Sequence, residues 1–124
     1  MGQETSTSQI LIIDTDCMLA DLLESHFQKK VGISCIDSFE ELLRTDVSEY
    51  SLVILNPSIG SDAGRQIVDI MRGNFEHEIP ILLISSPATR KEILDCLSAG
   101  ANDFISRPFE VTNLVARISK YLGI

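Results

Sequence analysis

Residues 52–57 read Leu-Val-Ile-Leu-Asn-Pro, so four apolar residues run directly into an asparagine and a proline. An apolar run without alternation is typical of a strand that helices cover on both faces, as in parallel sheets. In open parallel sheets, functional groups gather at the carboxyl ends of the strands. The stretch therefore predicts a central strand that delivers Asn56 to this rim of the sheet.

Similar runs recur along the chain, separated by segments with helical spacing of apolar residues. The expected strands are Ile10–Ile13, Val31–Ile36, Leu52–Leu55, Ile81–Ile84 and Asp103–Ser106. The expected inward-facing helix residues are Leu19, Leu22, Leu23 and Phe27, then Phe39, Leu42 and Leu43, then Ala63, Ile67, Ile70 and Met71, then Ile93, Leu94 and Leu97, and finally Val111, Leu114, Val115, Ile118, Tyr121 and Leu122. This alternation predicts βαβ units with right-handed crossovers and a three-layer α/β sandwich.

Local signals at the helix ends agree with this assignment. Ser38 and Glu41 form a capping-box pattern, Pro87 suits a first helical turn, and Gly100 suits a C-terminal cap. Residues 1–8 are polar and are expected to form a flexible tail, so the domain covers residues 9–124.

Composition limits the classes of function. A chain of 124 residues with 44% hydrophobic content suits one domain. The formal net charge of -8 disfavours direct binding to nucleic acid or to an anionic membrane, and favours a protein partner. The apolar runs are too short to span a bilayer, and the N-terminus has no signal-peptide pattern, so we expect a cytoplasmic chain.

The three cysteines, Cys17, Cys35 and Cys96, are odd in number and widely spaced. They contain no C-x-x-C pair, so the pattern indicates neither a disulfide framework nor a zinc site. We therefore expect three reduced thiols. His26 and His77 have no partner at ligand spacing, and each is expected on a surface or helix face.

Polar residues follow four of the expected strands, where parallel topology brings strand ends to one rim. They are Asp14, Thr15 and Asp16 after the first strand, Asn56 and Ser58 on either side of Pro57 after the third, Ser85 and Ser86 after the fourth, and Arg107, followed by Pro108, after the fifth. Carboxylates, an amide, hydroxyls and a guanidinium are therefore expected to converge.

At these positions the chain resembles the receiver domains of bacterial two-component response regulators, over residues 9 to 123. The motifs that carry the resemblance are residues 10–16 (Ile-Leu-Ile-Ile-Asp-Thr-Asp), residues 52–56 (Leu-Val-Ile-Leu-Asn) continuing to Gly64, residues 79–85 (Ile-Pro-Ile-Leu-Leu-Ile-Ser) and residues 100–109 (Gly-Ala-Asn-Asp-Phe-Ile-Ser-Arg-Pro-Phe). The resemblance implies a flavodoxin-like (βα)5 fold with a five-stranded parallel sheet in the order 2-1-3-4-5, and a role in phosphorelay signalling without enzymatic activity of its own.

In the family, an aspartate that ends the third strand accepts a phosphoryl group from a histidine kinase, two acids help to hold Mg²⁺, and a hydroxyl and a lysine contact the phosphoryl group. By this resemblance, Asp14 matches the first acid and Ser85 matches the hydroxyl. The other three positions depart, with Thr15 for the second acid, Asn56 for the acceptor and Arg107 for the lysine.

The chemistry of these departures predicts a degenerate pocket. A carboxamide is a far poorer nucleophile than a carboxylate, so Asn56 should not be phosphorylated. Conversion of Asn56 to aspartate by deamidation is disfavoured because Pro57 has no N–H. Mg²⁺ depends on carboxylates and phosphate oxygens, so any remaining affinity is expected to be weak and to rest on Asp14 and Asp16.

Arg107 retains a positive charge in the expected pocket. A guanidinium is a planar fork that favours carboxylates, so we expect Arg107 to reach Asp14 or Asp16. At about 4 Å and an effective dielectric of about 20, this pair has about 4 kcal/mol of Coulomb attraction before desolvation.

Further residues carry expectations of their own. Phe104 matches the family's switch aromatic, but without phosphorylation we expect a core phenylalanine on an edge strand. Pro108 is a candidate for a cis peptide bond. The basic residues of the last two helices, beside the family's usual interaction face, are candidates for a partner surface: Arg90, Lys91, Arg117 and Lys120.

Three functions remain open, and the first is favoured. The chain is a phosphorylation-independent interaction domain that binds another signalling protein or a C-terminal output domain. Alternatively, it is a phosphorylatable regulator, because Asn56 was introduced by mutation or because Asp16 or Asp62 is the acceptor. A weaker alternative is a flavodoxin-like domain that binds a small molecule, since fold does not determine function.

Overall fold

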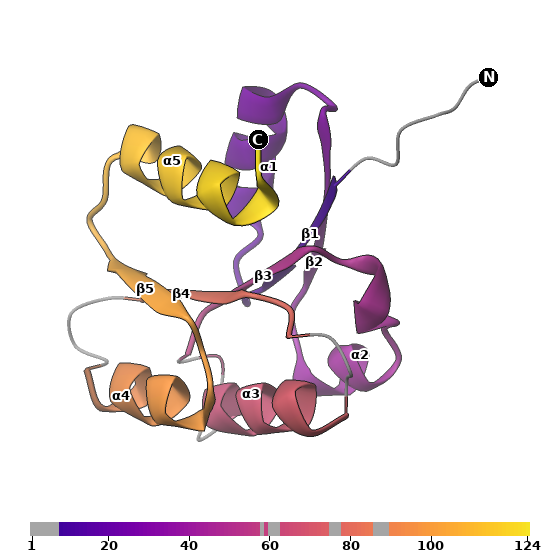
Figure 1. Cartoon of the computed structure of the whole chain (residues 1–124), viewed down its shortest axis with the longest axis vertical. Coiled ribbons are helices and arrows are strands. Elements are labelled where there is room, and N and C mark those ends of the chain that lie inside the picture. The colour runs from indigo at the N-terminus through magenta and orange to yellow at the C-terminus, as the bar shows by residue number, and fades with distance from the viewer. Residues whose placement is uncertain (1–7, 58, 60–62, 75–77, 86–89) are drawn as a thin grey trace.

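The computed structural model describes residues 8–57, 59, 63–74, 78–85 and 90–124. Its centre is a five-stranded sheet in the order β2-β1-β3-β4-β5, in which every neighbouring pair is parallel (Figure 1). The strands are β1 (Ser8–Ile13), β2 (Val31–Ile36), β3 (Leu52–Leu55), β4 (Ile81–Ser85) and β5 (Asp103–Ser106). The predicted sheet and its strand order are confirmed.

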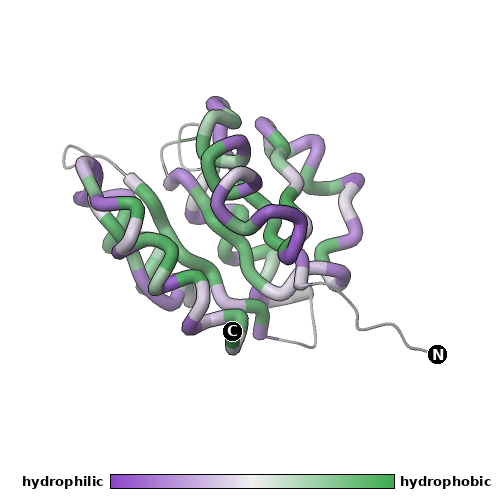
Figure 2. The backbone as a smooth tube through the Cα atoms, turned by 90° about the horizontal axis from the view of Figure 1, so that it is seen from above, coloured by the Kyte–Doolittle hydropathy of each residue, from purple (hydrophilic) through white to green (hydrophobic). Residues whose placement is uncertain are grey.

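Helices cover both faces of this sheet (Figure 1). They are α1 (Met18–Phe27), α2 (Phe39–Leu43), α3 (Ala63–Asn74), α4 (Arg90–Ala99) and α5 (Val111–Leu122), with a 3₁₀ turn, η1, at Val47–Glu49. One core cluster joins α1 and α5 to the sheet, and the other joins α2, α3 and α4 to the opposite face. In Figure 2 the strands are mostly hydrophobic, whereas the helices alternate in hydropathy. The chain is therefore a three-layer sandwich, as predicted.

Two strands are longer than their apolar runs. β1 begins at Ser8 because Ser8 and Gln9 pair with Val31 and Gly32 of β2. β4 extends to Ser85, which pairs with Ser106 of β5. Backbone pairing does not require an apolar side chain, so hydropathy alone underestimated both strands.

The helices expose several leucines that were predicted to face inward. Leu22 is 40% exposed, Leu43 is 62% exposed and Leu94 is 51% exposed. In α4 the buried positions are Ile93 and Cys96, so the inward stripe passes through the small thiol instead of Leu94. The helical spacing was correct, but the width of each buried stripe depends on how the helix packs against the sheet.

The predicted helix caps are largely present. Ser38 Oγ accepts a hydrogen bond from the Glu41 N–H at 3.1 Å, while the Glu41 carboxylate accepts from Asp37 N–H at 3.3 Å instead of from Ser38. Gly100 follows α4 with a φ of +126°, and its N–H donates to the Cys96 and Leu97 carbonyls. Pro87 and His77 lie outside the described residues, and His26 is exposed on α1 as expected.

The expectation of three reduced thiols is wrong for two of them. Cys17 and Cys35 form a disulfide with a Cα–Cα distance of 6.0 Å, and Cys96 is free and buried. The parallel register of β1 and β2 places Ile13 opposite Ile36, which brings the residues beside these strand ends together. The number of cysteines and their spacing in the sequence do not contain this register, so they did not predict the disulfide.

Within the part of the chain that the structure describes, no helix has the length and apolar character needed to cross a membrane.

Candidate functional site

The carboxyl ends of β1, β3, β4 and β5 bring the predicted polar residues to one rim. Asp14 follows β1 and is 5% exposed, while Asn56 follows β3 and is half-buried. Backbone hydrogen bonds hold them in register, because Asp14 N–H donates to Ile36 O and Asn56 N–H donates to Ile13 O, both at 3.0 Å. On the other side, Arg107 N–H donates to Ser85 O at 2.7 Å.

Asp14 is the centre of this cluster. Its Oδ1 atom accepts from Asn56 Nδ2 at 3.0 Å and from Asp16 N–H at 3.4 Å. A carboxylate at position 56 would place a second acceptor where Asn56 supplies a donor. The amide therefore stabilises the buried charge of Asp14 through a hydrogen bond.

Arg107 reaches Asp14, as predicted. Its Nη2 atom lies 3.9 Å from Asp14 Oδ2, and the arginine side chain is 41% exposed. The Cζ atom also lies 6.0 Å from the centre of the Phe109 ring, at the outer limit of a cation–π contact. The ion pair is a single long contact instead of a bidentate one, so solvent screening reduces its energy well below the unscreened Coulomb value.

Ser85 is the last residue of β4 and is 1% exposed. Its Oγ atom has no hydrogen-bond partner among the described residues. The adjoining residues 86–89 lie outside the described part of the chain. Ser85 therefore presents a buried hydroxyl near the rim without a described contact to Asp14 or Asn56.

The other polar residues after β1 face solvent. Thr15 and Asp16 are exposed, and Asp16 Oδ1 accepts from Met18 N–H at 2.9 Å at the start of α1. This position agrees with the expected solvated acid near a helix N-terminus. Among the described residues, no group of three or more His, Cys, Asp or Glu side chains is arranged to hold a metal ion. Ser58 and Asp62 lie outside the described residues.

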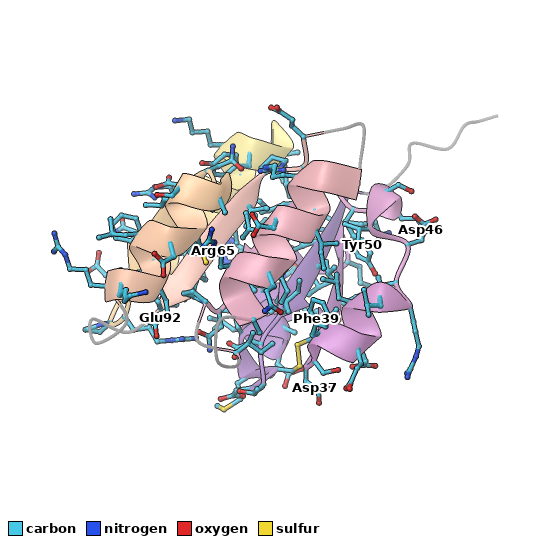
Figure 3. The ribbon with its side chains drawn as sticks, turned by 90° about the horizontal axis from the view of Figure 1, so that it is seen from below. Asp37, Phe39, Asp46, Tyr50, Arg65 and Glu92 are labelled. Atoms are coloured by element: carbon cyan, nitrogen blue, oxygen red, sulfur yellow. A yellow bond between two sulfur atoms is a disulfide. The ribbon has the colours of Figure 1, made fainter. Side chains whose placement is uncertain are left out.

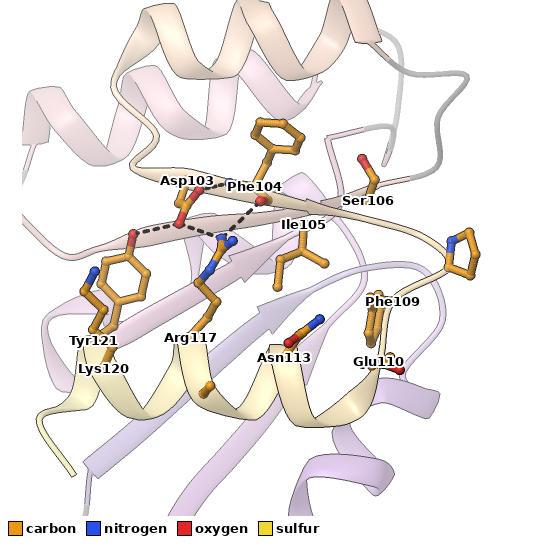
Figure 4. Close-up of a pocket in the computed structure, with 12 residues that line it drawn as sticks. Asp103, Phe104, Ile105, Ser106, Phe109, Glu110, Asn113, Arg117, Lys120 and Tyr121 are labelled. Carbon is orange, nitrogen blue, oxygen red and sulfur yellow. Dashed lines mark hydrogen bonds and ion pairs between the residues drawn. The ribbon is translucent and has the colours of Figure 1, made fainter.

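Phe104 differs from the prediction of a core residue, since it is 41% exposed. β5 is an edge strand in which only Ile105 is buried. Ile105 packs in the cluster with α5, and Phe104 points away from α5 (Figure 4). With Leu94, Leu97 and other residues it lines a groove of about 420 Å³ between α4 and β5.

A second groove, of about 810 Å³, runs between β5 and α5 (Figure 4). Arg117 Nη1 bonds to Asp103 Oδ2 at 2.7 Å and to Phe104 O at 3.3 Å, and Tyr121 Oη lies 3.5 Å from the same carboxylate oxygen. Partial burial, followed by the negative charge of Asp103, raises the pKa of Tyr121 above its usual value. Hydrophobic patterning did not indicate this polar group, because it forms only where α5 packs beside β5.

Three of the four predicted basic partner residues line these two grooves. Arg90 lines the groove beside α4, and Arg117 and Lys120 line the groove beside α5. Lys91 forms an ion pair with Asp95 at 2.9 Å within α4. The charges of Lys91 and Arg117 are therefore partly compensated. The Arg107–Pro108 peptide bond is cis, as anticipated for Pro108.

A family model described as the response regulator receiver domain matches residues 10–119. The chain belongs to the response regulator receiver family. Receiver domains are signalling domains of two-component systems, which pair with output domains or with other signalling proteins.

Relatives of this receiver domain include larger regulators. The regulatory protein VanR of Enterococcus faecium is 28% identical over 127 residues, covering 94% of this chain and 50% of VanR. The uncharacterized transcriptional regulatory protein YkoG of Bacillus subtilis is 30% identical over 117 residues, covering 88% of this chain and 48% of YkoG. The chain thus spans about half the length of these curated relatives.

Solved structures support the receiver fold. A two-component response regulator from Clostridium difficile has a TM-score of 0.79 and 24% identity, covering 94% of this chain and 97% of that chain. The BeF3-activated DrrB receiver domain, whose parent is from Thermotoga maritima, also has a TM-score of 0.79, with 20% identity and coverage of 96% and 100%. At these identities the likeness establishes the fold alone.

Proposed function

We propose that this chain is a degenerate receiver domain that binds a protein partner without control by phosphorylation. The observation that carries the proposal is the hydrogen bond from Asn56 Nδ2 to Asp14 Oδ1 at 3.0 Å. The amide stands at the end of the central strand, where the family resemblance implies an acceptor aspartate. It is a donor toward Asp14 and a poor nucleophile toward phosphorus.

The neighbouring residues support the same proposal. Arg107 pairs with Asp14 at 3.9 Å, so a permanent cation lies beside the one buried carboxylate of the cluster. The Mg²⁺ that the resemblance implies fits this cluster poorly, because Asp14 faces two hydrogen-bond donors and a guanidinium, and Asp16 accepts a bond from Met18 N–H. Hydrogen-bond donors offer a cation no lone pair.

The partner in this proposal is another signalling protein or an output domain on the same polypeptide. We place its contact surface at the edge of the sheet along β5, where Phe104 is exposed between two grooves. Arg90, Arg117 and Lys120 line these grooves, and Lys91 lies next to Arg90 on α4. We assign the domain to the cytoplasm, since relatives such as YkoG are named as transcriptional regulators.

A phosphotransfer experiment tests the proposal. The chain is incubated with acetyl phosphate and Mg²⁺, and its intact mass is measured. We expect no gain of a phosphoryl group, because the carboxamide of Asn56 does not form an acyl phosphate. Phosphorylation of the native chain, located by peptide mass at Asp16 or Asp62, would instead establish the phosphorylatable alternative.

Two variants serve as positive controls for phosphorylation in this assay. Asn56→Asp alone returns the acceptor, and Asn56→Asp combined with Thr15→Asp and Arg107→Lys returns every departing position to the family pattern. We expect the combined variant to gain one phosphoryl group in the same reaction. A natural gene that encodes aspartate at position 56 would also contradict the proposal. The family match gives the small-molecule alternative no support.

A further inference from the structure

The Cys17–Cys35 disulfide lies at the rim beside the polar cluster. Cys17 ends the loop that begins with Asp14 and immediately precedes α1, while Cys35 is the penultimate residue of β2. The yellow bond between two sulfur atoms in Figure 3 marks the disulfide. The same loop and strand also meet through the hydrogen bond from Asp14 N–H to Ile36 O at 3.0 Å. The covalent bond and this hydrogen bond therefore tie one short loop to β2.

We propose that Cys17–Cys35 is a reversible thiol–disulfide exchange site whose redox state controls the Asp14–Cys17 loop. Its co-reactant is a dithiol, either a small molecule or a protein. This inference is independent of whether Asn56 can accept a phosphoryl group.

Exposure distinguishes this disulfide from a buried structural crosslink. Cys17 is exposed and Cys35 is half-buried, whereas the free Cys96 is 1% exposed in the core. Exchange requires a thiolate to reach a sulfur atom, so accessible disulfides are the labile ones. The three cysteines thus divide into an accessible pair and one inert thiol.

The exchange reaction balances as follows. One thiolate of the dithiol attacks Cys17 Sγ, the bond to Cys35 Sγ breaks, and Cys35 leaves as a thiolate that takes up a proton. The second thiolate of the reductant attacks the reductant's own sulfur in the mixed disulfide and releases Cys17, which is then protonated. Two electrons pass to the chain, and the reductant leaves as its cyclic disulfide. A disulfide oxidant reverses these steps.

Reduction of the Cys17–Cys35 disulfide acts on the polar cluster through the short loop that joins Cys17 to Asp14. With the disulfide formed, Cys17 is held near β2 at a Cα–Cα distance of 6.0 Å, and only Thr15 and Asp16 separate it from Asp14. After the bond breaks, the Asp14–Ile36 hydrogen bond still links this loop to β2, but Cys17 is no longer covalently held there. The contacts of Asp14 with Asn56 and Arg107 then respond to a redox signal without phosphoryl transfer.

Alkylation of the folded chain tests the exchange. Aliquots are equilibrated in buffers with stepped ratios of reduced to oxidised dithiothreitol, quenched with N-ethylmaleimide, and analysed by peptide mass. We expect Cys17 and Cys35 to become labelled together in one transition as the buffers become more reducing. Cys96, which burial protects, should react with N-ethylmaleimide at least about tenfold more slowly than the reduced pair over the time of the quench. In the matched Cys17→Ser variant, Cys35 should be labelled in every buffer.

Two results would overturn the exchange site. One is labelling of both cysteines even in the fully oxidising buffer, which would mean that the disulfide does not form. The other is protection of both cysteines until the chain is denatured, which would make the bond purely structural.

Backbone amide chemical shifts test the coupling in the native sequence, so a variant that fails to fold does not block the measurement. Reduction should shift the amides of Asp14, Thr15 and Asn56, and leave those of Lys91 and Asp95 on α4 unchanged. Unchanged shifts at Asp14 and Asn56 would overturn the coupling. Shifts throughout the chain would also overturn it, because they would indicate loss of the fold instead of a local response.

Discussion

Asn56 is held by both its backbone and its side chain. Its N–H donates to Ile13 O and its amide group donates to Asp14, so the residue joins the ends of two neighbouring strands. Pro57 follows it and is buried, and a proline supplies no N–H for attack on the amide. The Asn56 amide is therefore held in place by hydrogen bonds and is protected from conversion to aspartate.

Replacing the Asn56 amide by a carboxylate should destabilise the folded chain. We expect Asn56→Asp to lower the free energy of unfolding by about 1–3 kcal/mol at pH 7, because it removes a donor and places a like charge beside Asp14. Repulsion raises the pKa values of the paired acids in the folded state. Compared with the native chain, the variant should therefore be least destabilised at low pH. Its stability relative to the native chain should fall as the pH rises through these pKa values.

Urea denaturation of both proteins across acidic and neutral pH provides the measurement. Asn56→Ala is the matched control, since it removes the same hydrogen bond without adding charge, and its loss of stability should depend less on pH than that of Asn56→Asp. An Asn56→Asp variant as stable as the native chain at pH 7 would contradict the contact with Asp14.

Cys96 gives a second prediction for a single residue. Burial, followed by the negative charges of Asp95, Glu92 and Asp69, raises the pKa of its thiol from 9.0 to about 11. The unfolded chain then loses this proton at lower pH than the folded chain. The stability that the buried thiol contributes is thus fully present below pH 9. It is lost between about pH 9 and 11, by about 1.4 kcal/mol for each pH unit.

Comparison with Cys96→Ala isolates this contribution, because tyrosines and lysines titrate in both proteins. The native chain should lose more stability than the variant between pH 9 and 11 in chemical denaturation. Parallel pH profiles for the two proteins would show that the thiol is not buried as described.

At the scale of elements, α3 depends on one close approach to the end of β3. A Cβ atom on Gly64 would lie 2.5 Å from Pro57 O and 2.8 Å from Pro57 Cα. Gly73 belongs to the same helix, and a Cβ atom there would meet nothing within 4 Å. The start of the helix, and not its whole length, therefore requires glycine.

This contrast predicts opposite effects for the same substitution. Gly64→Ala should lower the free energy of unfolding by about 1–3 kcal/mol, since backbone atoms beside Asn56 must move. Gly73→Ala should raise it by about 0.5–1 kcal/mol through helix propensity. Thermal and urea denaturation of both variants measure the difference. Equal effects at the two positions would contradict the packing of Gly64 on Pro57.

Elements far apart in the chain are also joined by polar contacts. Arg72 on α3 donates to Gly100 O and Ile79 O, both at 2.9 Å, and to Asn102 Oδ1 at 2.8 Å. Asn102 Oδ1 also accepts from Ile81 N–H at 2.8 Å, at the start of β4. One arginine thus connects α3 with β4 and with the segment that leads into β5.

At the scale of the whole molecule, the disulfide restricts the unfolded chain. It joins residues separated by 18 positions, a loop for which chain entropy predicts a stabilisation of about 3 kcal/mol. We expect reduction to lower the free energy of unfolding by about this amount. Urea denaturation with and without a reductant measures the loss, and Cys17→Ser should match the reduced native chain. No change on reduction would contradict the crosslink.

Much of this molecule could be predicted from the sequence. The strand assignments followed from apolar runs and helical spacing, whereas the strand order followed from the resemblance to receiver domains. Three strands agree residue by residue: Val31–Ile36, Leu52–Leu55 and Asp103–Ser106. The contact between Arg107 and Asp14 followed from topology and charge, because parallel strand ends share a rim. The exposure of Phe104 and Leu94 could not be predicted, since it depends on how α4 sits beside an edge strand.

The sequence by itself determined the receiver fold, the identity of the residues at the rim and the substitution of an amide for the implied acceptor. These are properties of local patterns and of residue chemistry. Tertiary structure alone decided that the amide donates to Asp14, that Cys17 meets Cys35, and that Arg72 connects three segments. Each of these depends on the register of parallel strands and on helix placement, which bring together atoms whose separation along the chain gives no sign of contact.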